Sequence, residues 1–261
     1  MSELPLPHLD PISDRAVFRQ IADHIRHAIE TGALSAGDKV PSEAKLMQHY
    51  GVARMTIRHA LQILQGEGLT VAEHGRGVFV RTRPLVRRLA SDRFARRHRD
   101  LGKAAFIVET EGAGGTPTVD SIAITEANPS PDVAARLALD LRELVVARTR
   151  RYLINGQPVE MATSYIPHAL AVGTRVMQPD SGPGGIYARL EEKGHRLERF
   201  EEEVRARMPY RDEVRALELA PGVPVFHLIR TAYAVGGRAI EVCDTVMSTD
   251  AYVLTYELPA S

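Results

Sequence analysis

Apolar residues near the N-terminus of the chain recur with the period of an amphipathic helix. In the segment AVFRQIADHIRHAIETGAL, the apolar positions are spaced three or four apart: Val17, Ile21, Ile25, Ala28 and Ile29. Gly32 follows at the place where such a helix would end. After the turn SAGDKVP, Ser42 and Glu43 indicate a helix start, and the short helical segment EAKLMQHY ends at Gly51. The pattern therefore predicts two helices before Gly51.

A third helix and a hairpin follow these two. The segment ARMTIRHALQILQGEG carries an apolar stripe made of Ile57, Ala60, Leu61 and Leu64. The next segment, LTVAEHGRGVFV, alternates around a glycine-rich tip at residues 74–77, which predicts two strands joined by a tight turn. The order helix, helix, short turn, helix, hairpin predicts a winged helix-turn-helix domain.

The pattern changes after this hairpin. Residues 81–103, RTRPLVRRLASDRFARRHRDLGK, carry a proline and a run of arginines, which is typical of a linker or a solvated hinge. Beyond them we expect strands in short β-like runs such as AFIVET, SIAIT, LVVARTRRYLI and PVFHLIRTAYAV. We therefore expect a helical domain over residues 12–81, a linker over 82–103 and a second domain over 104–258.

The second domain also contains an internal similarity. At an offset of 80, SIAITEANPSPDVAARLAL aligns with EEEVRARMPYRDEVRALEL, which pairs Ile124 with Val204, Pro129 with Pro209 and Leu137 with Leu217. At an offset of 81, YLINGQPVEMATS aligns with YAVGGRAIEVCDT, which pairs Tyr152 with Tyr233, Gly156 with Gly237 and Glu160 with Glu241. Each copy reads as strand, proline turn, helix, strand, tight hairpin, strand. Unless the likeness is a chance similarity of two hairpins, this predicts an α+β domain with a duplicated antiparallel sheet.

Composition adds an uneven distribution of charge. The chain carries 33 basic and 33 acidic side chains, yet residues 1–103 have a formal charge of +6 and residues 104–261 of −6. The basic first part suggests an anionic partner. The one cysteine, Cys243, excludes an intramolecular disulfide and a Cys-rich zinc site, and we expect it to be a small buried core residue. We find no signal sequence and no stretch of about 20 apolar residues, so we expect a cytoplasmic protein without a membrane partner.

Two arginines mark the start of the third helix. Arg54 and Arg58 lie one turn apart and face the same way, with Thr56 between them. In a helix-turn-helix the second helix enters the major groove, and an arginine fork can grip a guanine edge or a phosphate. Taken alone, the pair would more simply be solvated surface charge. The helix cap, the short turn and the glycine-tipped hairpin around it favour a DNA-reading helix.

Residues 15–81 resemble the DNA-binding domain of the GntR family of bacterial transcription regulators, through GDKVPSE, GVARMTIRHAL, EGL and HGRGVFV. The resemblance implies a set of DNA contacts: Arg54, Thr56 and Arg58 on the operator, Ser42 and the residues just after it on phosphate, and His74, Gly75 and Arg76 at the wing tip in the minor groove. The chain departs from the family pattern directly after PSE, where the family commonly has an arginine and this chain has Ala44 followed by Lys45. Lys45 would therefore supply a diffuse phosphate contact.

The second half is similar to the effector-binding (UTRA) domain of the HutC subfamily, whose fold resembles that of chorismate lyase. The motifs are ARTRRYLINGQPVEMATSYIP, GGIYARLEEKG and RTAYAVGGRAIEV. The resemblance implies effector contacts at Arg148, Arg150, Glu160, Gly185, Tyr187 and Glu241, with Arg93 and Phe94 of the linker closing over the ligand and Ser164 as a further candidate.

The chemistry of these residues suits an anionic effector. Arg148 and Arg150 alternate on one strand and so face the same side, where they could clamp a carboxylate or phosphate. Glu160 could orient the arginines or accept a hydrogen bond from a hydroxyl or ammonium group, and backbone N–H groups around Gly185 could meet an anion. The alternative is that Arg148, Glu160 and their neighbours form cross-strand ion pairs on a solvated sheet face.

The sequence contains no motif for metal binding, for a phosphate-binding loop or for nucleophilic catalysis. The second half shows no helical pair of histidines near carboxylates, no phosphate-binding loop and no nucleophile with a histidine at a recognisable spacing, so we expect no metal, no cofactor and no enzyme. The sequence thus predicts a ligand-responsive repressor that binds a pseudo-palindromic operator as a homodimer and responds to a small anionic metabolite. The alternatives are a lyase-like enzyme fused to a DNA-binding domain, and an architectural DNA binder whose second half only dimerises.

Overall fold

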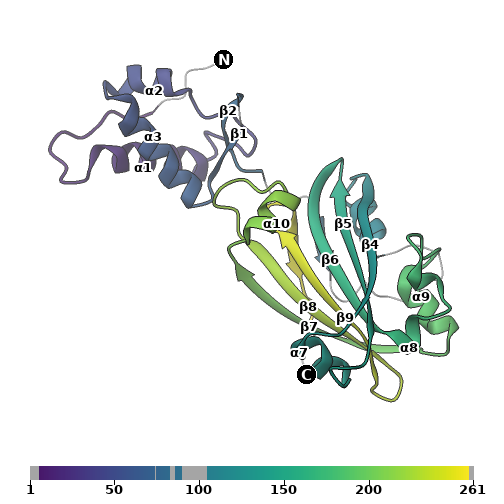
Figure 1. The fold of residues 1–261 in the computed structure, drawn as a ribbon. Helices are drawn as coiled ribbons and strands as arrows, with labels where there is room; N and C mark the ends of the chain where they lie inside the picture. The colour runs from purple at the N-terminus through teal and green to yellow at the C-terminus, as the bar shows by residue number, and fades with distance from the viewer. Residues whose placement is uncertain (1–5, 74, 83–85, 90–104, 259–261) are drawn as a thin grey trace. The chain divides into compact units, whose positions relative to one another are not determined.

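The described residues of the computed structural model, 6–73, 75–82, 86–89 and 105–258, form two units (Figure 1). One unit contains residues 1–83 and 220–223, and the other contains residues 84–219 and 224–261. The boundaries 12–81, 82–103 and 104–258 stay predictions. Among the described residues, we find no helix with the length and apolar character that a membrane span requires.

The first unit is a winged helix-turn-helix. Its elements are the helices α1 (Val17–Glu30), α2 (Glu43–Tyr50) and α3 (Arg54–Gly66) and the antiparallel strands β1 (Thr70–Glu73) and β2 (Gly77–Val80). The apolar stripes predicted from the sequence meet in one core, where Ile25, Ile57 and Leu64 are fully buried. Burial of these faces holds together helices that are too short to be stable alone.

Local signals fix the turn between α2 and α3. The Ser42 hydroxyl accepts a hydrogen bond from the N–H of Lys45 at 3.3 Å and so caps α2, as the sequence predicts. Gly51 ends α2 in the left-handed conformation, with φ of +65°, which glycine adopts without steric cost. Only two residues then separate Gly51 from the start of α3, so the turn is sharp and the front of α3 is exposed.

The second unit is built on a six-stranded antiparallel sheet with the strand order β4-β5-β6-β9-β8-β7 (Figure 1). The strands are β4 (Pro117–Ala127), β5 (Val145–Ile154), β6 (Gln157–Pro167), β9 (Ala239–Ser248), β8 (Val225–Ala234) and β7 (Leu197–Arg207). Helix α7 (Pro131–Leu137) follows β4, and α10 (Arg211–Ala216) follows β7. The order is symmetric about the β6–β9 contact, which confirms the predicted duplication.

The strand register corrects one detail of the predicted repeat. Tyr152 lies opposite Glu160, whereas Ala232 lies opposite Glu241, so Tyr152 corresponds to Ala232 and not to Tyr233. The offset is therefore 80 between β5 and β8, and it becomes 81 only between β6 and β9. The reason is the length of the turn. Two residues lie between the paired Ile154 and Gln157, whereas three lie between Ala234 and Arg238, which are joined by a backbone hydrogen bond.

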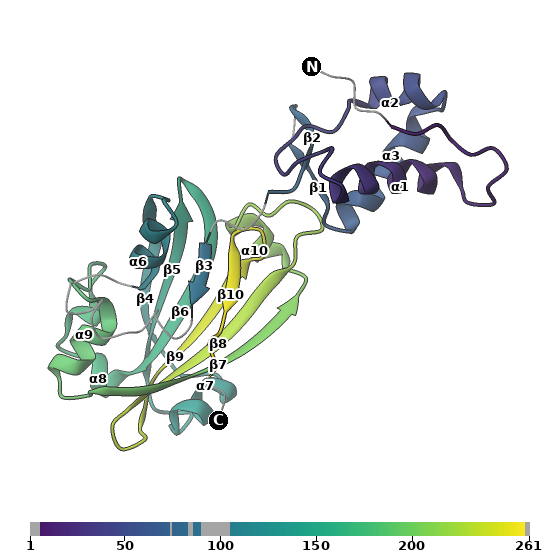
Figure 2. The ribbon, with the colours of Figure 1, turned by 180° about the vertical axis from the view of Figure 1, so that it is seen from behind.

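The two faces of the sheet are covered differently. On one face, α7 packs on Val145 and Val242, and Leu217 packs on Val225 and Val246. The opposite face, viewed in Figure 2, carries α6 (Ala105–Gly112), α8 (His168–Ala171), the 3-10 helix η1 (Arg175–Met177) and α9 (Gly185–Glu192). It also carries a parallel strand pair, β3 (Val86–Leu89) with β10 (Tyr252–Thr255).

Helix α6 contradicts the strand predicted for AFIVET. The apolar run is too short to reveal its period, and the residues after it continue as a helix to Gly112. Phe106 of α6 is buried against Tyr152, with a centroid distance of 4.7 Å between the rings. The helix therefore closes one end of the covered face.

Candidate functional site

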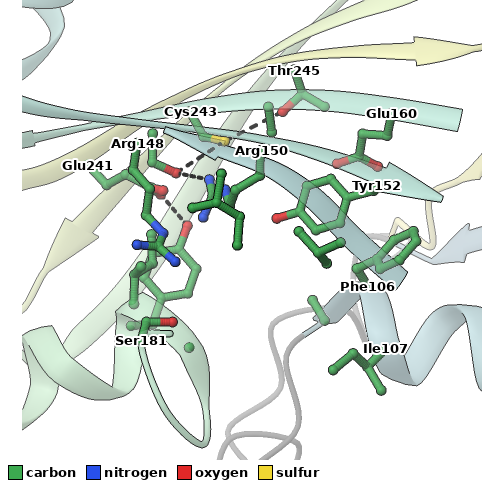
Figure 3. Close-up of a pocket in the computed structure, with 18 of the residues that line it drawn as sticks. Phe106, Ile107, Arg148, Arg150, Tyr152, Glu160, Ser181, Glu241, Cys243 and Thr245 are labelled. Carbon is green, nitrogen blue, oxygen red and sulfur yellow. Dashed lines mark hydrogen bonds between the residues drawn. The ribbon is translucent and has the colours of Figure 1, made fainter. Parts of the chain in front are cut away.

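A cavity of about 300 Å³ lies on the covered face of the sheet, between α6 and α9 (Figure 3). Side chains from β5, β6, β8 and β9 form its floor because residues two apart on a strand share a face. The polar ones include Arg148, Arg150, Glu160, Ser164, Arg230 and Glu241. The structure thus places most of the predicted effector contacts around one cavity. The alternative of a solvated sheet face is wrong, because Arg148 and both glutamates are buried.

Arg150 is a cation that faces the cavity without a carboxylate partner in the described part of the chain. Its Nη2 donates to the Ser164 hydroxyl at 2.5 Å, and its Nε–H has no hydrogen-bond partner there. Burial lowers the pKa of the guanidinium, but its neighbours, Tyr152 first, raise that pKa by more. The group therefore stays charged and keeps donor capacity for an anion.

Arg148 has a different environment. Its guanidinium donates to the backbone carbonyls of Val176, Gln178 and Pro179, the last at 2.5 Å. Burial lowers the pKa of Arg148, and Arg150 nearby lowers it further. Arg148 therefore fixes the segment before α9, so the structure offers Arg150 rather than a matched pair of arginines for clamping an anion.

The two buried glutamates each accept a hydrogen bond from a tyrosine. Tyr252 donates to Oε2 of Glu160 at 2.9 Å, and Tyr187 donates to Oε2 of Glu241. Burial raises the pKa of Tyr187 well above its usual value, so this hydroxyl keeps its proton. Oε1 of Glu241 has no hydrogen-bond partner among the described residues, and it is an acceptor left for a ligand.

The remaining predicted effector contacts have mixed outcomes. Gly185 and Tyr187 line the cavity. However, the N–H of Gly185 is not free for an anion, because it donates to the carbonyl of Gly182 at 3.1 Å. The Tyr187 hydroxyl is already bonded, so its ring is the part left as a wall. Arg93 and Phe94 lie outside the described residues.

On the first unit, the two arginines of α3 share one carboxylate. Arg54 Nε lies 2.5 Å from Oε2 of Glu43, and Arg58 Nε lies 3.0 Å from Oε1 of the same residue. The hydrogen bond from Arg54, followed by that from Arg58, lowers the pKa of Glu43 despite partial burial. Both arginine side chains remain exposed, at 63% and 50%. The N-terminal part of α3 therefore presents two exposed positive charges whose side chains are positioned by Glu43.

Each of the two units matches a known protein-family model. The model of the bacterial regulatory proteins of the gntR family matches residues 18–80, and the UTRA domain model matches residues 112–253. The chain belongs to the GntR family. It is therefore a DNA-binding transcription regulator with an effector-binding domain of the UTRA type, as the resemblance to the HutC subfamily implies.

Relatives cover nearly the whole of this GntR-family chain. The HTH-type transcriptional regulator Rv0792c of Mycobacterium tuberculosis is 30% identical over 92% of this chain and 85% of its own length. The HTH-type transcriptional repressor NagR of Bacillus subtilis is 26% identical over 92% and 93%. A crystal structure of a GntR-family transcriptional regulator covers 95% of this chain and 99% of its own, with a TM-score of 0.65 and 29% identity. These relatives are named as transcription regulators, and each aligns with nearly the whole of this chain.

The other predicted DNA contacts of this GntR domain lie on α2, α3 and the wing. Lys45 is exposed, whereas Thr56 is half-buried at the side of α3. Gly75 has φ of +72°, which the tight tip requires. Arg76 pairs with Glu73 and lies 5.4 Å above the Phe79 ring. His74 lies outside the described residues.

Arg230 is a residue of the site that was not predicted from the sequence. Its Nε donates to the Tyr187 hydroxyl at 3.1 Å, and its Nη2 lies 3.6 Å from Oε2 of Glu241. The residue corresponds to Arg150 at the offset of 80 that relates β5 to β8. Extending that offset through the strand would have found it, and its carboxylate partner distinguishes it from Arg150.

Proposed function

We propose that this protein is a homodimeric repressor that leaves a pseudo-palindromic operator when a small anionic metabolite enters the cavity of its UTRA domain. The observation that carries the proposal is the charge of Arg150. Arg150 is half-buried, stays charged and makes no ion pair among the described residues, so a bound anion would supply charge-assisted hydrogen bonds that this cation still lacks. A cavity of about 300 Å³ suits a small molecule rather than a polymer.

The other polar groups narrow the ligand further. The free acceptor Oε1 of Glu241 favours a ligand that carries a hydroxyl or ammonium donor as well as an acid group. Arg148 shapes the site by holding the loop that precedes α9. Sugar phosphates and hydroxy or amino acids satisfy both requirements. We propose Ser164, Gly185 and Tyr187 as walls of the same site.

A chain of contacts links this cavity to the strand that follows the DNA-binding domain. Glu160 accepts from Tyr252, and Tyr252 lies on β10, opposite Val86 of the parallel strand β3. Arg88 of β3 is fully buried and forms an ion pair of 2.6 Å with Glu202. Since β3 follows the wing strand in the chain, we propose that ligand bound near Glu160 changes how this strand is held. A coupling of about 1–3 kcal/mol would give a 5- to 150-fold change in operator affinity.

DNA binding is assigned to the front of α3 and to the wing. Two copies of α3 in a twofold dimer would read half-sites about 34 Å apart. We propose that Ser42, Lys45 and Arg76 contact the DNA backbone or the minor groove, and that Arg54 and Arg58 reach base edges. Because the partner is chromosomal DNA, we place the protein in the cytoplasm, and we propose no catalytic activity for it.

A thermal-shift experiment tests the effector site. Full-length protein is melted in the presence of inorganic phosphate, sugar phosphates, hydroxy acids and amino acids. A ligand present at 100 times its dissociation constant adds about 2.7 kcal/mol to stability. We expect at least one anion to stabilise the wild type and to leave Arg150→Gln unchanged. Arg215→Gln, an exposed arginine on α10, is the matched control and should respond like the wild type. Stabilisation of Arg150→Gln equal to that of the wild type would refute the site.

A further inference from the structure

One apolar side chain stands out on the exposed side of α3. Met55, which lies between the two arginines in the sequence, has a side chain that is 71% exposed. The core positions of the same helix, Ile57, Ala60, Leu61 and Leu64, are all buried. At about 100° per residue, Met55 lies about 170° from the middle of that buried stripe. It therefore occupies the centre of the face that points away from the protein core.

The neighbours of Met55 are held in place, whereas its own side chain is open to solvent. Glu43 ties down Arg54 and Arg58 at 2.5 and 3.0 Å. Thr56 lies half-buried on the opposite side of Met55 from Arg54. The exposed face of α3 thus carries an apolar side chain at its centre, with two fixed guanidinium groups together on one side of it. A single exposed methionine is common on protein surfaces and needs no explanation there. On the exposed face of a DNA-reading helix, however, its side chain would contact the DNA.

We propose that Met55 contacts the 5-methyl group of one thymine in each operator half-site, and so selects thymine over cytosine at that position. This inference rests on α3 being the DNA-reading helix. In the major groove, thymine alone presents a methyl group, whereas guanine presents the acceptors that suit Arg54 and Arg58. The unbranched thioether of methionine adapts its shape to such a partner. The helix would then read one apolar position beside positions read by arginine.

The test removes the methyl group from the DNA and the thioether from the protein. An operator duplex is first selected from random DNA by the full-length wild-type protein. Each thymine of a half-site is then replaced, one at a time, by deoxyuridine, which differs from thymine only by the methyl group. Dissociation constants are measured at fixed salt for the wild type, for Met55→Ala and for Met208→Ala. Met208 is the matched control, because it is a methionine with 59% exposure in the other unit.

We expect one thymine per half-site at which deoxyuridine weakens the wild type about fourfold, the effect of burying one methyl-sized group, about 0.8 kcal/mol. Met55→Ala should bind the thymine and deoxyuridine forms equally, and Met208→Ala should behave like the wild type. Equal sensitivity of the wild type and Met55→Ala at every thymine would overturn the inference, as would an operator without thymine in its half-sites. Failure of the wild type to select any DNA would instead refute DNA binding itself. Since Met55 is exposed, thermal unfolding of Met55→Ala should match that of the wild type.

Discussion

Replacing Arg150 by methionine should change the stability of the ligand-free protein by less than about 1 kcal/mol. The wild-type side chain is charged, faces the cavity and makes one described hydrogen bond, to Ser164. Removing that bond and the attraction of the neighbouring acidic groups costs about 1.5–3 kcal/mol, whereas relieving the desolvation of the guanidinium returns a similar amount. We therefore expect a net change of less than about 1 kcal/mol, or less than about 4 °C in melting temperature.

The neighbouring arginine provides a control for which we expect a clear loss of stability. Arg148 donates to three backbone carbonyls, and Arg148→Met would leave those acceptors without their charged donor. At about 1.5–3 kcal/mol for each such bond, two good bonds give a loss of about 3 kcal/mol or more. Urea denaturation of both full-length variants, followed by circular dichroism, measures the two free energies of unfolding. A loss of more than about 1 kcal/mol on Arg150→Met, which is the scale of one hydrogen bond, would show that Arg150 serves the fold rather than a ligand.

Three further predictions concern the DNA-binding unit and its link to the cavity. Arg54→Ala should abolish operator binding at moderate salt and leave the circular dichroism spectrum unchanged; unaltered operator affinity would contradict the role of α3. Because Arg54 and Arg58 lower the pKa of Glu43, that carboxylate stabilises the folded state above its unfolded pKa, and the effect is lost as the pH falls through the folded pKa. The stability difference between wild type and Glu43→Gln in denaturant melts should therefore shrink from pH 7 to pH 3, and a constant difference would exclude the charge as its source. Tyr252→Phe removes the hydroxyl that donates to Glu160, so it should reduce the ligand-induced change in operator affinity while the ligand affinity, measured by calorimetry, persists. If the ratio of operator affinities with and without ligand stays the same as in the wild type, the contact between Tyr252 and Glu160 does not transmit the signal.

The sequence predicts the first unit almost completely because its signals are local. Periodic apolar residues, the Ser42 cap and Gly51 each act within one or two helical turns, and the structure confirms all three. The duplicated sheet was also predictable, since two hairpins of similar sequence impose the same pairing. AFIVET was not, because its six residues fit both a strand and a helix until Phe106 meets Tyr152 from another element.

The candidate site shows where sequence reasoning stops. Arg148 and Arg150 look equivalent on one strand, and only the fold brings the carbonyls of residues 176–179 to the first and leaves the second open. The role of Tyr252 was equally hidden, because its partner Glu160 is distant in sequence. Contacts of this kind depend on which loop covers the sheet, and no local pattern encodes them.

The most direct test of the whole account is the operator affinity of the full-length protein with and without the anion that stabilises it. Fluorescence anisotropy of a labelled operator duplex would measure both dissociation constants for the wild type and for Arg150→Gln. The account predicts at least about a fivefold loss of affinity on saturation of the wild type, and no change for the variant. An operator affinity that stays the same when the wild-type cavity is saturated would contradict it.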